Sequence, residues 1–242
     1  MTTRTVRAEH PGPARIRTNL ATLDLTVIAE PGRTHAELTI STRDEDGPSA
    51  EAVNDATLTV HGTTLEARLT QRGAGATTII QTGRGGASFS SINIGGGIVV
   101  AGGGSVMING RVINAGGGGT TIINGGSPIT VTARVPEGGS VSASSISGDV
   151  ETRGRLADVD ASSTSGDVMI ETTASARVQT VSGDVTIDHL TGTADLASTS
   201  GDVTVYGDSS ARARARTVSG DVRGSGGLDL DGSSVSGRVR NR

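Results

Sequence analysis

Five aspartates recur at a nearly constant spacing through the C-terminal half of the chain. Each lies in the unit Ser-Gly-Asp-Val, and the glycines of successive units are 17 to 19 residues apart. If the units stack side by side, their carboxylates form a column that could bind cations, because calcium takes several oxygen ligands at once. The aspartates of this column are Asp149, Asp167, Asp184, Asp202 and Asp221.

The same spacing also fits a structural turn that holds no metal. Aspartate beside glycine can accept hydrogen bonds from neighbouring backbone amides, and glycine permits a bend with positive φ. Calcium-binding solenoids use a denser Gly/Asp repeat, which supplies more oxygen ligands per turn than one aspartate does. We therefore expect a solvated turn at each unit, with the metal ladder as the alternative. The expected turn glycines are Gly148, Gly166, Gly183, Gly201, Gly220 and Gly237.

The last copy of the unit has an arginine where the others have aspartate. It reads Ser-Gly-Arg-Val, and Arg238 should then lie over Asp221 and partly neutralise the end of the acidic column. Charged residues on an exposed terminal strand hinder further strand pairing. The last copy therefore predicts an end cap that opposes polymerisation through this end of the repeat.

A short basic stripe precedes the last copies. Arg212, Arg214 and Arg216 alternate with alanines, so the alanines should face inward and the arginines outward. We expect a solvated face in which acids of neighbouring coils, such as Asp195 and Asp229, pair with the arginines. An anion or phosphate contact is the alternative, because arginine binds such groups through paired hydrogen bonds.

Most catalytic chemistry lacks its residues in this chain. There is no Cys and no Lys, which excludes disulfides, thiolate zinc sites and phosphate-binding loops of the lysine type. The histidines are scattered, and no Gly-x-Ser-x-Gly elbow is present. The candidate carboxylate clusters are Asp158 with Asp160 and Asp229 with Asp231, which we interpret as solvated turns. We expect no catalytic residue, no cofactor and no metal.

The repeat predicts the architecture that carries these residues. A fixed period near 18 residues is typical of one coil of a β-solenoid. Apolar residues such as Ile170, Val178 and Leu196 alternate with polar ones, so each coil should hold two short strands that fill a common core. We expect an all-β protein whose residues 128–242 form a β-solenoid of six coils with about 18 residues each.

Two further regions precede the repeat. Residues 1–75 contain alternating apolar and polar segments separated by turns at Pro31-Gly32 and His61-Gly62, which predicts an antiparallel β region. The stretch from Ser49 to Ala56 tolerates a helix but is short. Residues 76–127 are a Gly-rich insert with no acidic residue. The insert forms short strands, with a hairpin turn at Asn109-Gly110, or it is flexible. Its uncharged apolar runs favour self-association when exposed.

Charge and hydropathy limit the partners. The formal net charge is −4, and nucleic-acid-binding domains usually present a basic face with stacking aromatics, so nucleic acid is not expected. No N-terminal apolar run resembles a secretory signal, and no stretch has the length of a transmembrane helix. We expect a cytoplasmic protein that binds a protein partner or itself, without a small-molecule ligand.

The chain resembles the bacterial β-strand-repeat family called domain of unknown function 4097 (DUF4097), also described as "putative adhesin". The resemblance rests on the tandem Ser-Gly-Asp-Val units, on the alternating N-terminal strands, and on the strand from Ile129 to Val135 with its turn at Pro136. It implies the β-repeat fold over most of the chain apart from the Gly-rich insert. The family has no agreed biochemical activity.

These observations favour a non-catalytic β-solenoid scaffold or interaction protein with long flat faces. A self-assembling filament protein like the bactofilins is the alternative, since bactofilins also use a β-helix with coils of similar length. The uncharged insert favours the filament, and the arginine-containing last coil opposes it. A polysaccharide-active β-helix enzyme is the third hypothesis, although one Phe and one Tyr offer few platforms for a sugar.

Overall fold

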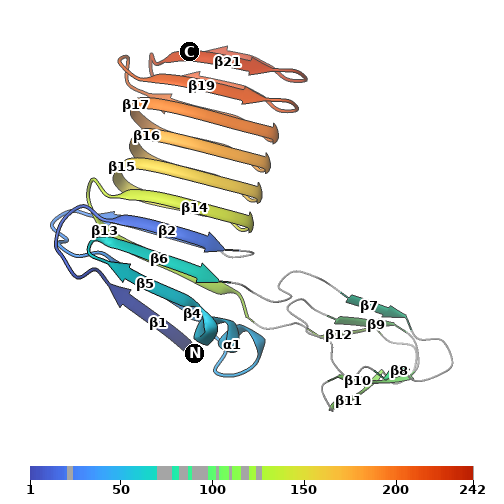
Figure 1. Ribbon diagram of the computed structural model, residues 1–242. Coiled ribbons are helices and arrows are strands. Elements are labelled where there is room, and N and C mark those ends of the chain that lie inside the picture. Colours follow the sequence, from blue (N-terminus) through green and yellow to red (C-terminus); the bar gives the residue numbers. More distant parts are fainter. Residues whose placement is uncertain are drawn as a thin grey trace.

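The described part of the protein consists mostly of β-strands, as the sequence predicts. The computed structural model describes residues 1–20, 24–69, 78–81, 87–88, 98–101, 104–108, 111–115, 120–123 and 127–241. Within them, sixteen strands form one large sheet that is mostly parallel, and two smaller sheets have three strands each. The large sheet folds into two layers that face each other in a solenoid-like stack (Figure 1).

The first layer contains the longer path of hydrogen-bonded neighbours. In spatial order its strands are β1 (Thr2–Arg7), β4 (Glu37–Thr42), β13 (Ile129–Pro136), β3 (Asp24–Glu30), the first parts of β15 (Val150–Ser165), β16 (Val168–Ser182) and β17 (Val185–Ser200), then β18 (Val203–Gly207), β20 (Val222–Ser225) and β22 (Val239–Asn241).

The second layer lies opposite. Its strands are, in spatial order, β5 (Thr57–His61), β6 (Thr64–Leu69), β2 (Arg15–Leu20), β14 (Ser140–Ser147), the second parts of β15, β16 and β17, then β19 (Arg212–Thr217) and β21 (Asp229–Ser234).

Strands β15, β16 and β17 each bend and run through both layers. Val150 of β15 pairs with Val168 of β16, which in turn pairs with Val185 of β17, and each pairing is parallel. The register slips at the bend of β15, between Thr152 and Arg155. The Ser-Gly-Asp units form the opposite corner, where the chain returns to the first layer. Each coil therefore repeats the path of the preceding one, which makes neighbouring strands parallel.

The N-terminal part of the chain belongs to the same large sheet. The predicted antiparallel pairing is present between β1 and β4, between β4 and β13, and between β5 and β6. Strands β2, β3 and β6 differ from the prediction, since β3 lies parallel between β13 and β15, and β2 lies parallel between β14 and β6. Alternation of apolar residues is the same in both kinds of sheet, so the sequence pattern could not show the direction. The sheet and its core continue across residue 128.

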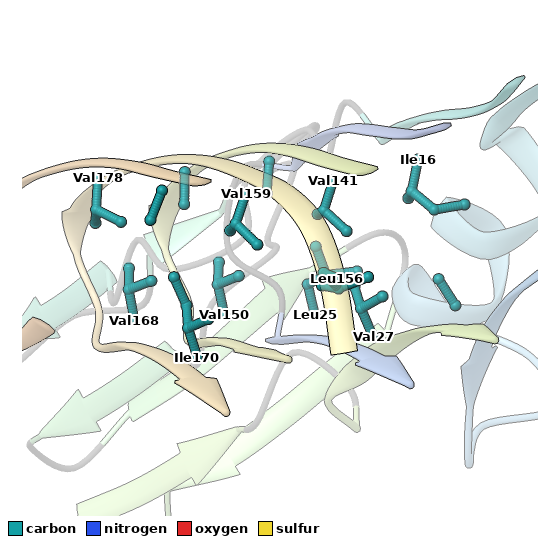
Figure 2. Packing of buried hydrophobic residues seen from close by; sticks show 14 of the residues in the cluster. Ile16, Leu25, Val27, Val141, Val150, Leu156, Val159, Val168, Ile170 and Val178 are labelled. Atoms are coloured by element: carbon teal, nitrogen blue, oxygen red, sulfur yellow. The ribbon is translucent and has the colours of Figure 1, made fainter. Parts of the chain in front are cut away.

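Aliphatic side chains of Ala, Val, Ile and Leu fill the space between the layers (Figure 2). They are aligned by the register into columns in which each residue stacks on its equivalent in the next strand. A column of the first layer contains Val131, Leu25, Val150, Val168 and Val185, all buried. A column of the second layer contains Leu65, Ile16, Val141 and Val159. Because the layers lie close together, this core is filled without a single buried aromatic side chain among the described residues.

A short helix lies at the N-terminal end of the stack. Helix α1 (Pro48–Asp55) forms where the sequence suggested only a tolerant stretch, because Ala50 and Val53 are buried against the end of the core. The side chain of Arg4 donates hydrogen bonds to the carbonyl oxygens of Asn54 and Ala56, at 2.6 and 2.5 Å. These bonds satisfy carbonyl groups that the end of a helix leaves free. No helix in the described part of the chain is long and apolar enough to span a membrane.

The Gly-rich insert contains six of the described strands. Strands β7 (Thr78–Gln81), β9 (Ile98–Ala101) and β12 (Thr120–Ile123) form one small sheet. Strands β8 (Ala87–Ser88), β10 (Gly104–Ile108) and β11 (Arg111–Ala115) form the other. The antiparallel pairing of β10 with β11 agrees with a hairpin, although its predicted turn at Asn109-Gly110 lies outside the described residues.

Candidate functional site

The repeated aspartates form a hydrogen-bonded ladder along one corner of the stack. The backbone amide of Asp184 donates to Oδ1 of Asp167, the amide of Asp202 to Oδ1 of Asp184, and the amide of Asp221 to Oδ1 of Asp202, each at 2.8 Å. Asp167 bonds to Asp149 in the same way, at 2.9 Å. The predicted acceptor role of the carboxylates is therefore present, but each carboxylate accepts from the next coil.

Asp24 is a member of this ladder that the sequence analysis missed. Its Oδ1 accepts the backbone amide of Asp149 at 3.2 Å, and the amide of Leu25 donates to the carbonyl oxygen of Asp149. The segment Asp-Leu-Thr-Val that begins at Asp24 has the same pattern as Asp-Val-Thr-Ile from Asp184 and Asp-Val-Thr-Val from Asp202. This similarity is a signal of an isolated coil, far from the tandem copies in the sequence but adjacent to them in space.

Arg223, rather than Arg238, neutralises the end of the acidic column. Its guanidinium lies 2.8 Å from Oδ2 of Asp202 and 2.7 Å from Oδ2 of Asp221. The backbone amide of Asp221 and the Arg223 guanidinium hold the pKa of Asp202 below its usual value, and the bond to Asp202 raises the pKa of Arg223. Arg238 takes part through its backbone amide, which donates to Oδ1 of Asp221 at 2.9 Å, and its side chain has no ion pair with a described residue.

The repeat glycines are required for close contact between coils, and the predicted positive φ is wrong. Positive φ occurs at other glycines, including Gly32 and Gly62 at two of the predicted turns. A Cβ atom on Gly183 would collide with the carbonyl oxygen of Gly166, and one on Gly201 with the carbonyl oxygen of Gly183. Only hydrogen fits there, because the corner of each coil lies directly against the glycine of the preceding coil. The same collision is found at Gly166, Gly220 and Gly237.

The aspartate ladder leaves one oxygen of each carboxylate outside the coil-to-coil bonds. Across the residues that the structure describes, no group of three or more His, Asp or Glu side chains is arranged to hold a metal ion. At the C-terminal end of the ladder the second oxygens of Asp202 and Asp221 are bound by Arg223. The arrangement therefore uses the carboxylates to join backbone corners.

The arginine stripe lies on the outer surface of the second layer. Arg214 Nε is 3.1 Å from Oδ2 of Asp231, and Arg212 Nε is 3.8 Å from Oδ2 of Asp229. Arg216 is in register with a serine and has no ion pair among the described residues. Acids of the neighbouring strand therefore pair with two of the three arginines, and the predicted anion contact stays a prediction.

A band of alternating charge continues along the same surface. Arg177 is in register with Asp160 on one side and Asp195 on the other, and Asp195 is in register with Arg214. A depression of about 360 Å³ surrounds Arg177 and is also lined by Asp158, which belongs to one of the predicted carboxylate clusters. Opposite charges at neighbouring positions of a sheet favour the observed register.

A column of exposed β-branched side chains runs beside the aspartate ladder. Each member comes two residues before the repeat glycine and is exposed, and it follows a serine or threonine that is buried in every copy except the last, where Ser234 is partly buried. The exposed fractions of Ile146, Val181, Val218 and Val235 are 60, 48, 47 and 79%. We call this column the corner stripe; it consists of Ile146, Thr164, Val181, Thr199, Val218 and Val235. The spacing of the repeat units did not reveal this exposed column.

Parallel strands that wind in two layers, with one corner motif repeated from coil to coil, define a solenoid-like repeat protein. The chain belongs to the Toastrack DUF4097 family, whose model matches residues 15–240. The resemblance drawn from the repeated units is thereby confirmed. No curated protein matches the chain.

Several solved structures are similar over nearly the whole chain. One, described as a "putative adhesin" from Bacteroides fragilis, is 14% identical with a TM-score of 0.49, covering 100% of this chain and 97% of that one. A "putative cell adhesion protein" from Clostridium sporogenes is 8% identical with a TM-score of 0.43, with 99% and 96% covered. A "putative lipid binding protein" from Parabacteroides distasonis is 11% identical with a TM-score of 0.39, with 99% and 97% covered.

Proposed function

We propose that the protein is a non-catalytic scaffold that binds a partner protein through the corner stripe. The observation that carries the proposal is the exposure of β-branched side chains at equivalent positions of successive coils, from Ile146 to Val235. Four of the six members are Ile or Val and two are Thr, and exposed apolar patches often mark interaction sites. The stripe is held in place because β16 is hydrogen-bonded to β15 on one side and to β17 on the other, so binding costs little ordering.

The surroundings of the stripe indicate the chemistry of the partner. The aspartate ladder follows the stripe along the same corner, separated from it by one serine and one glycine in each coil. Free carboxylate oxygens beside an apolar column complement a segment that presents apolar side chains flanked by basic ones. The partner that fits best is therefore a protein strand or loop with this alternation.

The use of the chemically active side chains supports a non-catalytic role. The aspartates that could have held a metal or acted as acids accept backbone amides instead, as Asp167 and Asp184 do. Two of the three arginines that could have bound an anion lie near carboxylates, as Arg214 does. Atoms engaged in this way stabilise the coils, which leaves mainly the second carboxylate oxygens of the ladder for a partner.

A binding experiment tests the proposal. In Val181→Lys/Val218→Lys the stripe loses its apolar character, while both positions are already exposed and should accept lysine without unfolding. Met169→Lys is the matched control, because Met169 is equally exposed on the first layer, away from the stripe. In native cells, we expect the wild type and Met169→Lys to be crosslinked to the same partner proteins. These proteins should not be crosslinked to Val181→Lys/Val218→Lys. Equal recovery by all three proteins contradicts the proposal.

Self-assembly is the alternative use of the same surface. Sedimentation velocity of the purified protein distinguishes self-assembly from binding of a partner protein, because a filament sediments as a broad, concentration-dependent series of large species. A single slowly sedimenting species supports binding of a partner protein. Filaments in electron micrographs that disappear in Val181→Lys/Val218→Lys would replace the partner with a second copy of the chain.

A further inference from the structure

A second depression lies on the outer surface of the first layer, near its C-terminal end. It measures about 310 Å³ and is lined by side chains of three neighbouring strands, β18, β20 and β22. Thr204, Arg223 and Arg240 are in register and form one row across it. Tyr206 and Ser225 are also in register and form a second row, two residues further along the strands.

The two arginines of the first row differ in their partners. Arg223 is fixed by ion pairs to Asp202 and Asp221, so its charge is balanced and its position is set. Arg240 has no carboxylate within ion-pairing distance in the part of the chain that the structure describes. The uncompensated positive charge of the depression therefore belongs to Arg240, whose planar guanidinium matches a carboxylate.

Tyr206 supplies the other half of a recognition surface. It is the chain's one tyrosine, and its side chain is 46% exposed. A tyrosine ring offers a flat apolar surface with a polar hydroxyl at its edge. The C–H face of a sugar ring can pack on such a surface. The hydroxyls of Thr204 and Ser225, which are partly buried in the two rows, can donate to or accept from sugar hydroxyls.

We propose that this depression binds a carboxylated sugar unit of an acidic polysaccharide. Arg240 binds the carboxylate, Tyr206 packs against the ring, and Thr204 and Ser225 bind ring hydroxyls. The combination favours a sugar acid over a free oxyanion, because phosphate would use Arg240 and the hydroxyls but would leave the face of the Tyr206 ring without a contact. The sequence suggested too few aromatics for a sugar surface, but the exposed Tyr206 ring lies beside Arg240, which has no ion pair with a described residue.

The site is open, so a single sugar unit should bind weakly. An exposed ion pair and one ring surface correspond to a dissociation constant on the order of millimolar. Several chains attached to one surface would bind a polysaccharide far more tightly than one does. This inference goes beyond the proposed binding of a partner protein, because it uses a different face from the corner stripe.

Nuclear magnetic resonance of the full-length protein labelled with ¹⁵N tests the proposal. The probes are glucuronic acid, glucose and inorganic phosphate, each titrated to about 50 mM, well above a millimolar dissociation constant. We expect glucuronate to shift the amide signals of residues 204–206 and 223–225 in a saturable way. Glucose and phosphate should shift the same signals at least about tenfold less at equal concentration.

Three variants separate the two contacts. Arg240→Gln and Tyr206→Ala should each weaken glucuronate binding by roughly tenfold, while Tyr206→Phe, which keeps the ring, should bind as the wild type does. Arg216→Gln is the control, because Arg216 also lacks an ion pair among the described residues but lies on the second layer. All three positions are exposed, so thermal melting of the four variants should be unchanged.

Several results would overturn the proposal. The proposal fails if glucuronate produces no localised shifts. It also fails if phosphate shifts the same signals equally, which would leave a plain anion site. Unchanged binding by Arg240→Gln or by Tyr206→Ala would remove the assigned contacts. These outcomes do not depend on the crosslinking of Val181→Lys/Val218→Lys, so failure of one proposal leaves the other intact.

Discussion

The backbone amide of Asp202 donates to the carboxylate oxygen of Asp184, at 2.8 Å, one full coil earlier in the chain. The neighbouring amide of Val203 bonds to the carbonyl oxygen of Asp221, as in an ordinary parallel ladder. The corner therefore has one amide per coil that the main chain does not satisfy, and the aspartate supplies the missing acceptor. A buried or partly buried amide without an acceptor is costly, which explains why the aspartate recurs.

Replacement of Asp184 separates the acceptor from its charge. Asp184→Asn keeps an oxygen in place and removes a like charge from the column, so we expect the free energy of unfolding to change little. Asp184→Ala leaves the amide of Asp202 without its acceptor and should cost about 1–2 kcal/mol. Urea denaturation measures both. If the asparagine variant loses as much stability as the alanine variant, the negative charge matters and the acceptor account is wrong.

The glycines of the corner should tolerate no side chain. Gly201→Ala forces a methyl group against the carbonyl oxygen of Gly183, and we expect a loss of about 3 kcal/mol. Gly32→Ala is the matched control, since Gly32 has a positive φ but open space around it, and should cost about 1–2 kcal/mol. Thermal and urea unfolding give both values. A loss at Gly201 no larger than the loss at Gly32 would mean that contact between coils does not select glycine at the corner.

A buried hydroxyl in the core offers a stabilising substitution. Thr152 lies in an inner column between Val27 and Ile170, and its Oγ1 is buried without a hydrogen-bond partner among the described residues. Thr152→Val replaces the hydroxyl with a methyl group of similar size and should raise the free energy of unfolding by about 1 kcal/mol.

Thr173 is the control for this prediction. It is equally buried, but its hydroxyl donates to the carbonyl oxygen of Ser175 at 2.8 Å. Thr173→Val should therefore lower the free energy of unfolding by about 1 kcal/mol. Opposite signs for the two substitutions, measured by urea unfolding, support the account. Equal signs would show that the size of the side chain decides both.

The sequence predicts the repeat and its inward residues well, because both depend on local spacing. Val178 and Leu196 are buried where alternation places them, and Val150 aligns with Val168 as the period requires. The place of Asp24 could not be predicted, since its partner Asp149 lies 125 positions further along the chain. The direction of strand β3, which begins at Asp24, depends on the path of the whole chain, and no local sequence pattern indicates that path.

The corner residues show a different limit. Spacing alone revealed that glycine and aspartate recur, but their roles depend on the distance between coils. The glycine is explained by a carbonyl oxygen of the previous coil, and the aspartate by an amide of the next one. Arg223 was passed over because its two partners, Asp202 and Asp221, come together only when the coils stack. Contacts between coils were therefore the part that the sequence could not supply.

The pairing of Asp202 with Arg223 should make the stability of the protein depend on acid. The folded-state pKa of Asp202 lies below its unfolded value, chiefly because its carboxylate accepts the Asp221 amide and then because it pairs with Arg223. A lowered pKa stabilises the folded state fully above the unfolded pKa, near about 3.9, and this contribution is lost as the pH falls through the lower folded value. We therefore expect the free energy of unfolding, measured with urea, to fall more for the wild type than for Asp202→Asn between about pH 4.5 and pH 2.5.

Asp188→Asn is the control, because it removes a carboxylate that has no ion pair in the described part of the chain. Its free energy of unfolding should depend on pH as steeply as that of the wild type. If all three proteins lose stability in parallel, the Asp202 contacts do not distinguish its folded from its unfolded state.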